Sequence, residues 1–476
     1  MTASFAQAWT TCYTSHGLQE IEIQVLLRKG LPRFDIIGLP QNMVREGKDR
    51  ILASLHQVGI ELPNQKVLVY LKPGDLSKEG SHLDLGIFHA ILQVLGHIPL
   101  IEKKYFFWGE LELNGKIRET ESILGHVLLA QESQADSIFF SNSKNNLEKI
   151  LPFLKSKVHF CDSAAELLEP KEAFTIEVSS DLSRSSWPDP KLQTRWNKMR
   201  GSHDQFLFWS LASLGRWNVL LNGSPGVGKS SWCHALQDLQ RPLAPKFWSE
   251  KFKYSSPAET KNLEFKDLSQ RGFEAPHHTS SAASIVGGGH RQIYAGAISR
   301  AHRGILFLDE LPEFQRNVLE ALREPLEEKK LCIHRQGGKK SFPADIQLLA
   351  AMNPCRCGKH GSKKACVCSS AQFYSYQARL SEPLLERFHR VLWWTFKDEP
   401  QAPEFEFQKI CERLSWAEKN RPQLHEIDLS AFKNARQQRL WVEMLLTWSK
   451  FFGVNQVNDT ESQNLKNFFE KLEERE

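Results

Sequence analysis

The sequence contains no run of about 18 uninterrupted apolar residues, so it predicts no transmembrane helix. Residues 1–13 lack a basic stretch followed by an apolar core, which is the pattern of a secretory signal. Internal repeats and low-complexity tracts are also missing. These absences favour a cytoplasmic protein made of ordinary globular domains, and 476 residues are enough for roughly two to four of them.

An excess of charge of one sign is missing as well, because the formal net charge at pH 7 is only +5. Such a balance permits an anionic partner such as nucleic acid without requiring one, since local clusters matter more than the total. A disulfide scaffold is disfavoured, because the nine cysteines are an odd number and four of them crowd into residues 355–368. That crowding suits a metal site in a reducing compartment better.

Composition and periodicity divide the chain into four stretches. Residues 1–170 alternate short apolar runs with helical periodicity and predict an α+β domain. Residues 171–205 are polar, with Ser, Asp and Pro, and we interpret them as a linker. Residues 206–395 alternate strand and helix signals, which predicts an α/β core. Residues 396–476 have helical periodicity and predict a small helical domain.

A glycine-rich motif is present at residues 223–230, where GSPGVGKS matches G-x-x-x-x-G-K-[ST] in full. An apolar run precedes it and a helix-compatible segment follows. In this pattern backbone N–H groups surround the phosphates of a nucleotide, Lys229 reaches the β- and γ-phosphates, and the Ser230 hydroxyl binds Mg²⁺. The alternative is a turn that merely starts a helix. The predicted nucleotide-binding residues are Gly223, Ser224, Pro225, Gly226, Val227, Gly228, Lys229, Ser230 and Ser231.

Two acidic residues, Asp309 and Glu310, follow four apolar residues in the same α/β block. At the end of a buried strand, Asp309 would hold Mg²⁺ and Glu310 would polarise the attacking water. Asn353 ends another predicted strand, where a polar side chain of a parallel sheet faces the ligand crevice. An Asn that only caps the turn before Pro354 is the alternative. Together these residues predict an ATP- and Mg²⁺-dependent hydrolase.

Longer motifs resemble the magnesium-chelatase-like AAA+ ATPases of the ComM/YifB type. They are RGFEAPHHTSSAASIVGGG, GAISRAHRGILFLDELPEFQRNVLEALREPLE and LLAAMNPCRCG, with RFDIIGLPQNMVREGKDRILASL and LKPGDLSKEGSHLDLGIFHAIL in the N-terminal stretch. The resemblance implies a P-loop AAA+ module that acts as a ring, usually a hexamer, with ATP bound between subunits. It also implies that Asn353 is the sensor-1 residue, which positions the hydrolytic water.

The resemblance assigns two arginines outside the P-loop. Residues 382–389 read EPLLERFH and are similar to the family's G-P-L-L-D-R-I-D, which makes Arg387 the arginine finger of the neighbouring subunit's site. Arg436 precedes an amphipathic helix and resembles the sensor-2 arginine of the C-terminal helical lid, which touches the γ-phosphate. Glu382 replaces a glycine and His389 replaces an acid of the family pattern. A surface cation on a helix is the other interpretation of Arg387.

The first domain of this family resembles the proteolytic domain of Lon, an α+β fold of the ribosomal S5 domain 2-like type. There a G-P-S-A-G-like turn presents a nucleophilic Ser beside a Lys. Here residues 78–84 read KEGSHLD, with His82 at the place of the nucleophile, and no matching Lys lies around residues 123–127. Ser81 is interpreted as a turn residue. We therefore expect no proteolysis, and a domain that binds a partner or substrate.

Four cysteines in a Cys-x-Cys, eight residues, Cys-x-Cys arrangement can close into a tetrahedron around Zn²⁺. The alternative is reduced free cysteines, with His360 as a possible substitute ligand. The candidate ligands are Cys355, Cys357, Cys366 and Cys368. The flanking cations, which such a loop would display to phosphates, are Arg356, Lys359, Lys363 and Lys364.

A second basic element lies at residues 329–340 and is predicted to be a β-hairpin, because two glycines lie near its tip. In related AAA+ ring helicases a hairpin at this place lines the central pore and grips DNA. Arg335, Lys339 and Lys340 are the candidate DNA contacts by that resemblance. A solvated hairpin tip is the alternative, and without aromatic residues for base stacking, contacts to the DNA backbone would dominate.

The leading hypothesis is an ATP-driven DNA translocase or helicase that acts on branched or recombination DNA. The alternatives are a protein-remodelling or metal-insertion ATPase, like the chelatase subunits, and a nucleotide-gated scaffold with weak turnover. The expected cofactors are ATP and Mg²⁺, with Zn²⁺ as a candidate. The expected partners are DNA, further copies of the chain in a ring, and a protein bound by the N-terminal domain, with no membrane.

Overall fold

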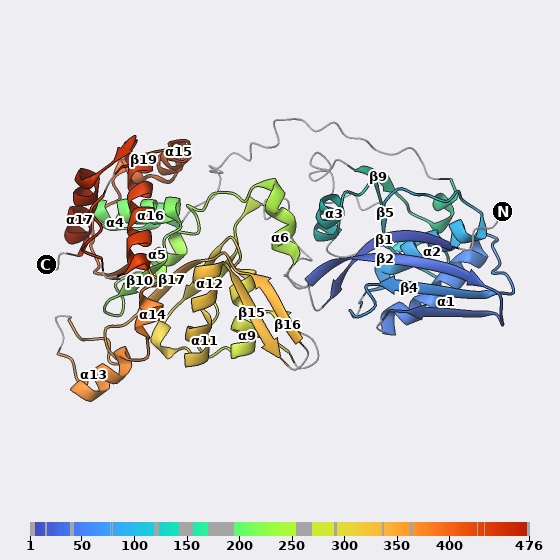
Figure 1. Ribbon diagram of the computed structural model, residues 1–476, viewed down its shortest axis with the longest axis horizontal. Coiled ribbons are helices and arrows are strands. Elements are labelled where there is room, and N and C mark those ends of the chain that lie inside the picture. Colours follow the sequence, from blue (N-terminus) through green and yellow to red (C-terminus); the bar gives the residue numbers. More distant parts are fainter. Residues whose placement is uncertain are drawn as a thin grey trace. The chain divides into compact units, whose positions relative to one another are not determined.

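The computed structural model describes residues 5–14, 17–38, 42–76, 78, 80–118, 123–141, 156–169, 195–253, 269–289, 293–335, 338–361, 365–425, 427–432 and 434–473, and the statements below refer to these residues. Contacts divide the chain into two compact units (Figure 1). The first comprises Met1–Ser185 and Leu243–Ser269, and the second comprises Ser186–Pro242 and Gln270–Glu476. None of the described helices combines the length and the apolar content that a bilayer crossing needs.

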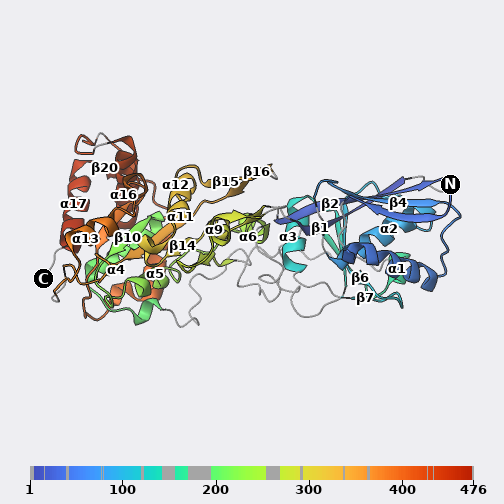
Figure 2. The same ribbon diagram turned by 90° about the horizontal axis from the view of Figure 1, so that it is seen from below.

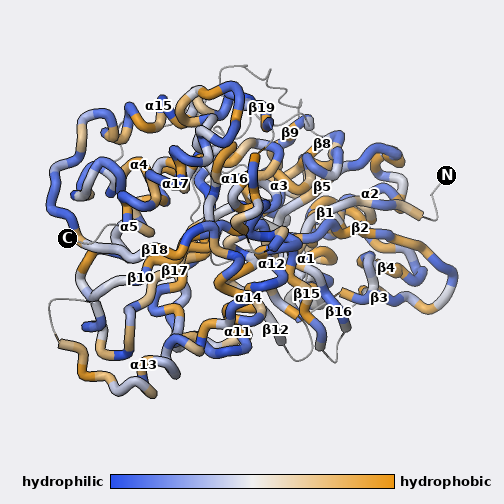
Figure 3. The backbone as a smooth tube through the Cα atoms, turned by 60° about the vertical axis from the view of Figure 1, so that its left-hand side comes forward, coloured by the Kyte–Doolittle hydropathy of each residue, from blue (hydrophilic) through white to orange (hydrophobic). Residues whose placement is uncertain are grey.

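The first unit is built on a mixed sheet of seven described strands in the order β3-β4-β2-β1-β5-β8-β9. The pairs β1–β2 and β2–β4 are antiparallel, whereas β3–β4 and the run β1-β5-β8-β9 are parallel. Polar and apolar residues alternate along much of β2 (Figure 3). The burial of its side chains alternates with them over most of its length. The strands are β1 (Phe5–Thr14), β2 (Gly17–Arg28), β3 (Arg33–Ile37), β4 (Lys66–Lys72), β5 (Tyr105–Trp108), β8 (Ser137–Phe140) and β9 (Lys157–Phe160).

Helices pack on both faces of this sheet. Neighbouring residues of β5 point to opposite faces, and their side chains lie in two different apolar clusters. Phe107 lies in the apolar cluster formed with α1 and α2, whereas Phe106 and Trp108 lie in the cluster formed with α3. Helices form at residues 42–57 and 84–95, within the N-terminal stretch for which the sequence predicts helical segments. The further elements are α1 (Asn42–Gln57), α2 (Asp84–Leu95), α3 (Ile123–Glu132), η1 (Ser81–Leu83), η3 (Ala164–Leu167), β6 (Glu110–Leu111) and β7 (Ile117–Arg118).

A segment from the middle of the chain completes the core of the first unit. It contains η6 (Pro245–Phe247) and α6 (Trp248–Lys253). Leu243 and Trp248 are buried in the same cluster as Phe106 and Trp108. The Trp248 indole donates a hydrogen bond to the Leu243 carbonyl at 2.8 Å, which satisfies its polar atom inside an apolar surrounding. Residues that follow position 242 are therefore part of this hydrophobic core.

The second unit has a five-stranded sheet in which every described pair is parallel, with the order β11-β14-β17-β10-β18. The three strands predicted before the glycine-rich motif, Asp309 and Asn353 are confirmed. Strands β14 and β17 are buried throughout, as strands of a parallel sheet covered on both faces are expected to be. The strands are β10 (Val219–Asn222), β11 (Phe273–Glu274), β14 (Ile305–Leu308), β17 (Gln347–Met352) and β18 (Arg390–Trp393).

Helices surround this sheet, and a hairpin extends away from it (Figures 1 and 2). The hairpin predicted at residues 329–340 is confirmed as β15 (Lys330–Arg335) and β16 (Gly338–Pro343). The central helices are α4 (His203–Gly215), α5 (Lys229–Ala235), α9 (Ala282–Val286), α10 (Ala297–Arg300), α11 (Arg316–Ala321), α12 (Arg323–Glu328), α13 (Ser370–Gln377) and α14 (Glu382–Leu385). The C-terminal helices are α15 (Phe407–Ala417), α16 (Ala435–Phe452) and α17 (Asp459–Glu473). Short elements are η5 (Trp196–Lys198), η7 (Leu311–Glu313), η8 (Pro403–Phe405) and the small pairs β12 (Gly287–Gly288) with β13 (Tyr294–Ala295) and β19 (Gln423–Leu424) with β20 (Gln456–Val457).

Tryptophan residues dominate the core of the second unit. One apolar cluster joins the sheet and α4 to the C-terminal helices, and it includes Trp441 and Phe469 from α16 and α17. Helix α16 is capped at its N-terminus by Asn434, whose side chain accepts a hydrogen bond from the Gln437 amide, and at its C-terminus by Gly453 in the left-handed conformation. The other buried tryptophans of this cluster are Trp196, Trp209, Trp217, Trp232 and Trp394. The chain is thus a mixed α/β protein whose parallel sheet is consistent with a P-loop module.

Candidate functional site

The glycine-rich loop connects strand β10 to the first turn of helix α5. Gly226 and Gly228 have φ values of +84° and +83°, which only glycine adopts without strain. Lys229 begins the helix and is buried, and its ammonium donates to the carbonyls of Gly223 at 2.6 Å and Ser224 at 2.9 Å. Burial lowers the pKa of Lys229 from its ordinary value. The loop thus has the strand–turn–helix context that a phosphate-binding loop requires.

Asp309 and Ser230 lie against each other. The Ser230 hydroxyl donates to Oδ2 of Asp309 at 2.7 Å, although the two residues are 79 positions apart in sequence. Oxygen atoms of a hydroxyl and a carboxylate are ligands that Mg²⁺ accepts beside phosphate oxygens. These two residues therefore fit a shared magnesium ion, as the sequence predicts.

Glu310 is held in an unusual backbone conformation. Its φ and ψ of 54° and 47° place a non-glycine residue in the left-handed region, at a cost of about 1–3 kcal/mol. Its carboxylate is half exposed and lies 3.2 Å from Nδ1 of His278, a residue of the APHHTSS stretch. Strain of this kind clusters at functional sites, where the surrounding structure fixes the residue. The carboxylate remains accessible to solvent, as a group that polarises water must be.

The sheet order brings these groups together. Strand β17 lies between β10 and β14, so the carboxyl ends of all three parallel strands meet at one edge. Asn353 follows β17, and its Oδ1 accepts a hydrogen bond from Lys229 at 3.2 Å. Side-chain contacts thus join Lys229 to Asn353 and Ser230 to Asp309, and Glu310 follows Asp309 directly. Asn353 faces the loop instead of only capping a turn.

Lys229→Ala is expected to weaken ATP binding by roughly 10- to 100-fold or more, because it removes charge-assisted hydrogen bonds to phosphate. Titration with a fluorescent ATP analogue measures the affinity, and thermal unfolding checks that the fold is retained. Lys198→Ala removes an exposed lysine of the same unit and is the matched control. Unchanged affinity in the Lys229 variant would contradict the assignment of the loop.

Arg387 and Arg436, the predicted finger and sensor-2 residues, share one carboxylate. Arg387 is buried, with Nη2 at 2.9 Å from Oε2 of Glu327 and further bonds to the carbonyls of Arg323 and Pro383. The other oxygen of Glu327 pairs with Arg436. Arg436 also reaches Glu386 at 3.2 Å. The structure thus brings the two arginines together, and both are held by residues of the second unit.

These arginines line a cavity of about 470 Å³ in the second unit. His389, which replaces the family acid, lies in its wall and is bound on both ring nitrogens. Nδ1 accepts from the backbone amide of Asn218 at 2.9 Å, so the proton resides on Nε2, which faces Glu443 at 3.3 Å. The contact with His389 holds the pKa of Glu443 below its ordinary value. His389 therefore has a structural part in the wall of the cavity.

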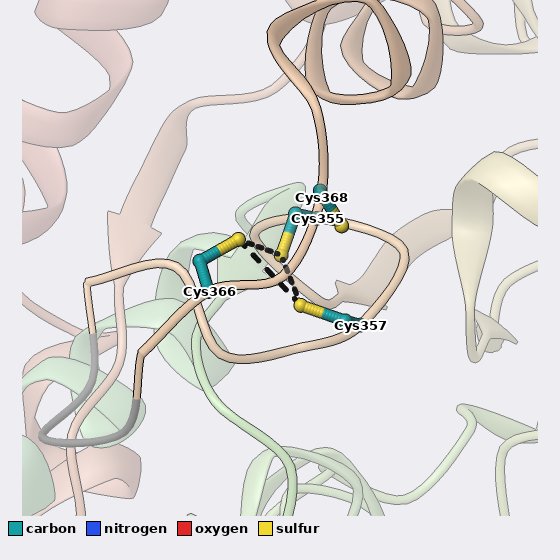
Figure 4. A group of neighbouring side chains, drawn as sticks. All are labelled: Cys355, Cys357, Cys366 and Cys368. Carbon is teal, nitrogen blue, oxygen red and sulfur yellow. Dashed lines mark hydrogen bonds between the residues drawn. The ribbon is translucent and has the colours of Figure 1, made fainter.

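The four predicted metal ligands gather in one place (Figure 4). All four sulfur atoms lie within 4.8 Å of one another, and the three pairs among Cys355, Cys357 and Cys366 are 3.4, 3.6 and 3.7 Å apart. Four thiolates at about 2.3 Å from Zn²⁺ would be separated by about 3.8 Å, which is close to these distances. Hydrogen bonds from the backbone of Lys359 and Val367 lower the pKa of Cys357 to about 6. The donor set fits a structural zinc site, and His360 is not needed to complete it.

The predicted basic surfaces are placed unevenly. On the hairpin Lys339 is exposed, but Lys340 is buried: its ammonium donates to the Ile293 carbonyl at 3.0 Å and lies over the Phe342 ring. Burial lowers the pKa of Lys340 to about 7. In contrast to the expectation, Lys340 therefore presents no cation to solvent in this structure. The Arg335 side chain lies outside the described residues.

On the cysteine-rich loop the cations are described only in part. Arg356 is exposed and Lys359 is half-buried, whereas Lys363 and Lys364 lie outside the described residues. The basic groups that remain for a phosphate-contacting surface are thus Lys339 on the hairpin, with Arg356 and Lys359 on the loop. Their role stays a prediction.

In the first unit the residues around the Lon-like turn make internal contacts. Ser81 donates to Glu110 at 2.7 Å, and Lys78 donates to the carbonyls of Gly38 and Pro73, so these two do not pair with each other. His82 bonds to the Thr11 carbonyl at 2.8 Å. His126, from the stretch where no Lys was found, is 2.6 Å from the Thr11 hydroxyl.

Both histidines are deeply buried, and burial lowers the pKa of His82 to about 4 and that of His126 well below its ordinary value. Two neutral imidazoles packed against a threonine form a core network, since neither side chain reaches solvent. The described residues of this turn thus contain no serine–lysine pair.

Sequence reasoning missed Glu327 and His278. Glu327 belongs to the acidic run of REPLEE and reads as a solvated helix residue, whereas it holds two arginines from distant parts of the chain. His278 could have been noticed as a titratable residue in a stretch quoted for the resemblance. Its contact with Glu310 depends on the placement of two loops, which no local pattern gives.

Comparison with known proteins extends these observations. Residues 196–398 match the family described as "Magnesium chelatase, subunit ChlI", and residues 22–144 match "Subunit ChlI of Mg-chelatase". The chain is 33% identical to competence protein ComM of Haemophilus influenzae over 79% of this chain and 74% of that protein. It is also 33% identical to the uncharacterized protein YifB of Escherichia coli over 77% of this chain and 71% of that protein. A protein of Mycobacterium tuberculosis, Rv2897c, is 30% identical over 77% and 72%.

Proposed function

The chain belongs to the magnesium-chelatase-like family of ComM and YifB, a family of AAA+ ATPases, and from that membership we propose that it is an ATP-hydrolysing motor that acts on DNA. The activity proposed is translocation or strand separation on branched or recombination DNA. The observation that carries the ATPase part is the convergence of Lys229, Ser230, Asp309, Glu310 and Asn353 at the carboxyl edge of three adjacent strands.

Each residue has a part that follows from its position. Loop amides and Lys229 would bind the phosphates, and Ser230 and Asp309 would hold Mg²⁺, which would supply neutralising charge to the phosphate oxygens. Glu310 accepts a proton from the attacking water, and Asn353 orients that water while its contact with Lys229 fixes its amide.

A ring of identical subunits is part of the proposal, because Arg387 and Arg436 do not contact the P-loop residues of their own subunit among the bonds described. In a head-to-tail ring, one surface of each subunit contacts a different surface of the next subunit. A residue far from the nucleotide site of its own subunit can therefore complete the nucleotide site of the neighbour. We assign Arg387 to the neighbour's γ-phosphate in this way, with Arg436 beside it. A hexamer is the ring size expected for AAA+ proteins.

DNA is proposed as the partner for two reasons. One relative bears the name competence protein. In addition, Lys339 stands exposed on a hairpin that extends from the sheet, and Arg356 and Lys359 lie on the loop that follows β17. Such cations would contact phosphates without reading base sequence.

A protein-directed activity, of the chelatase or remodelling kind, is the second candidate. The description of the matched family favours it, because it names one subunit of a magnesium chelatase. The first unit is the surface proposed for such a partner, because its Lon-like turn lacks the serine–lysine pair among the described residues. Proteolysis is not proposed.

ATP turnover is expected to rise several-fold when forked or single-stranded DNA is added to the purified protein. Steady-state ATPase assays measure the rate, and fluorescent forked substrates report strand separation. Stimulation should decrease as salt rises, because binding through phosphates releases counterions. Turnover indifferent to DNA, together with stimulation by a protein partner, would decide for the second candidate.

A further inference from the structure

The four-cysteine loop lies against the nucleotide-binding loop. We call the residues 355–361 and 365–368 the cysteine knuckle. It follows directly on Asn353, and between β17 and α13 the described residues form no helix or strand. A segment without regular hydrogen bonding keeps one conformation only where other bonds fix it. The cysteine cluster can supply such bonds through a bound Zn²⁺, in addition to the hydrogen bonds described below.

The knuckle touches the P-loop at one glycine. Gly358 is buried, with φ at +73°, and its amide donates to the Cys355 carbonyl at 2.9 Å. A Cβ added to Gly358 would lie 2.6 Å from Cγ and 2.8 Å from Cδ of Pro225. The proline ring of the P-loop therefore rests on the backbone of the knuckle, with no room for a methyl group between them.

The base of the knuckle is joined to the same loop by a second route. Asn353 accepts a hydrogen bond from Lys229, and helix α13 fixes the chain beside it. The Gln377 side chain donates to the Pro354 carbonyl at 2.7 Å, and the buried Tyr376 bonds to the backbone of Asn353. One end of the knuckle thus reaches the lysine that binds phosphate, and its interior reaches the proline at the tip of the P-loop.

We propose that the cysteine knuckle, when it holds Zn²⁺, supports the P-loop and thereby sets the affinity for ATP. A glycine-rich loop loses conformational entropy when it closes around phosphates, and a rigid neighbour reduces that loss by limiting the loop beforehand. Zn²⁺ joins the two arms of the knuckle, Cys355 and Cys357 on one and Cys366 and Cys368 on the other. Zinc removal would release the support without changing any residue that binds the nucleotide.

This inference rests on the proposed ATP binding, and the experiment separates the two. The full-length protein is assayed for zinc by elemental mass spectrometry. It is then treated with a chelator under reducing conditions, freed of the chelator, and titrated with a fluorescent ATP analogue at fixed Mg²⁺, with and without added Zn²⁺. We expect about one zinc per chain. The affinity of the stripped protein should be roughly tenfold lower, as if about one more residue had to be ordered, and should recover with Zn²⁺.

Two substitutions distinguish support from mere metal binding. Gly358→Ala leaves all four cysteines in place and pushes Pro225 away, so it should keep the zinc but lose affinity for the analogue to a similar extent. Gly361→Ala is the matched control, because Gly361 has the same φ of +73° but is exposed. It should bind the analogue as the unaltered protein does. Thermal unfolding of each variant checks the fold.

The outcomes point in different directions. Unaltered protein that binds no analogue at all contradicts the proposed ATP binding. Protein that binds the analogue but carries no zinc, or whose affinity ignores zinc removal, overturns the support. A Gly358→Ala variant with full zinc and undiminished affinity overturns it as well. Weakened binding in both the stripped protein and this variant, with Gly361→Ala unaffected, is the expected result.

Discussion

Glu310→Gln is expected to slow ATP turnover by roughly 10²- to 10⁴-fold while ATP stays bound, since that is the usual contribution of a general base. The amide keeps the shape of the side chain but cannot accept the proton of the attacking water. Its carboxylate stands free enough to do so in this structure, half exposed and paired only loosely with His278 at 3.2 Å. Single-turnover hydrolysis and analogue binding, measured on the same preparation, separate the two steps.

Glu328→Gln is the matched control for this substitution. Glu328 is an exposed glutamate of the same unit that pairs with Lys330 on the surface. Its loss should leave turnover within a factor of about two, because exposed ion pairs contribute little. A Glu310 variant that hydrolyses ATP at the normal rate would move the role of general base to another group, and His278 is the nearest candidate.

Arg387→Ala is expected to leave ATP binding intact and to reduce turnover by roughly 10³- to 10⁵-fold, the contribution measured for arginine fingers. The arginine stabilises negative charge that appears only in the transition state, so its loss lowers the rate more than the affinity. Arg439→Ala is the control, because Arg439 lines the same cavity but is largely exposed and pairs with Glu443. Steady-state assays at several protein concentrations separate lost catalysis from lost assembly.

Mixing tests whether Arg387 acts on the neighbouring subunit. Rings made from equal amounts of Arg387→Ala and Glu310→Gln chains contain sites in which an intact Glu310 meets an intact Arg387 from the neighbour. About one quarter of the sites have this composition if subunits mix at random in a head-to-tail ring. The mixture should therefore hydrolyse ATP far faster than either protein alone. No gain on mixing, with ring assembly demonstrated, would place Arg387 in its own subunit's structure, where Glu327 already holds it.

How far the sequence predicts this protein depends on the distance between the residues involved. The P-loop, the acidic strand end and the hairpin follow from runs of a few residues, and the structure contains the expected strands and turns. The family motifs carried the assignment of Asn353, which stays a prediction, and the structure places its side chain beside Lys229. These features depend on short stretches of sequence, or on such stretches together with the common carboxyl edge of a parallel sheet.

Features that depend on long-range packing were not predicted. Lys340 reads as a hairpin cation, but its neighbour in space is the Ile293 carbonyl 47 positions away. Glu327 holds Arg436 over 109 positions, and Gly358 meets Pro225, which follows a neighbouring strand. No periodicity or spacing encodes which loop will lie beside which. Side chains at such meeting points are assigned by the tertiary fold alone.

The segment that follows the P-loop helix limits how the two units of this protein can be exchanged by recombination. Leu243 and Trp248 lie between sequence elements of the ATPase unit, yet they fill the core that contains Phe106 and Trp108. The two units are therefore not consecutive modules that recombination could exchange at a single crossover. A hybrid gene that joined this N-terminal stretch to another ATPase would lack part of its interior. Exchange between relatives preserves the core of the first unit only if the N-terminal stretch and the segment from Leu243 to Ser269 are transferred together.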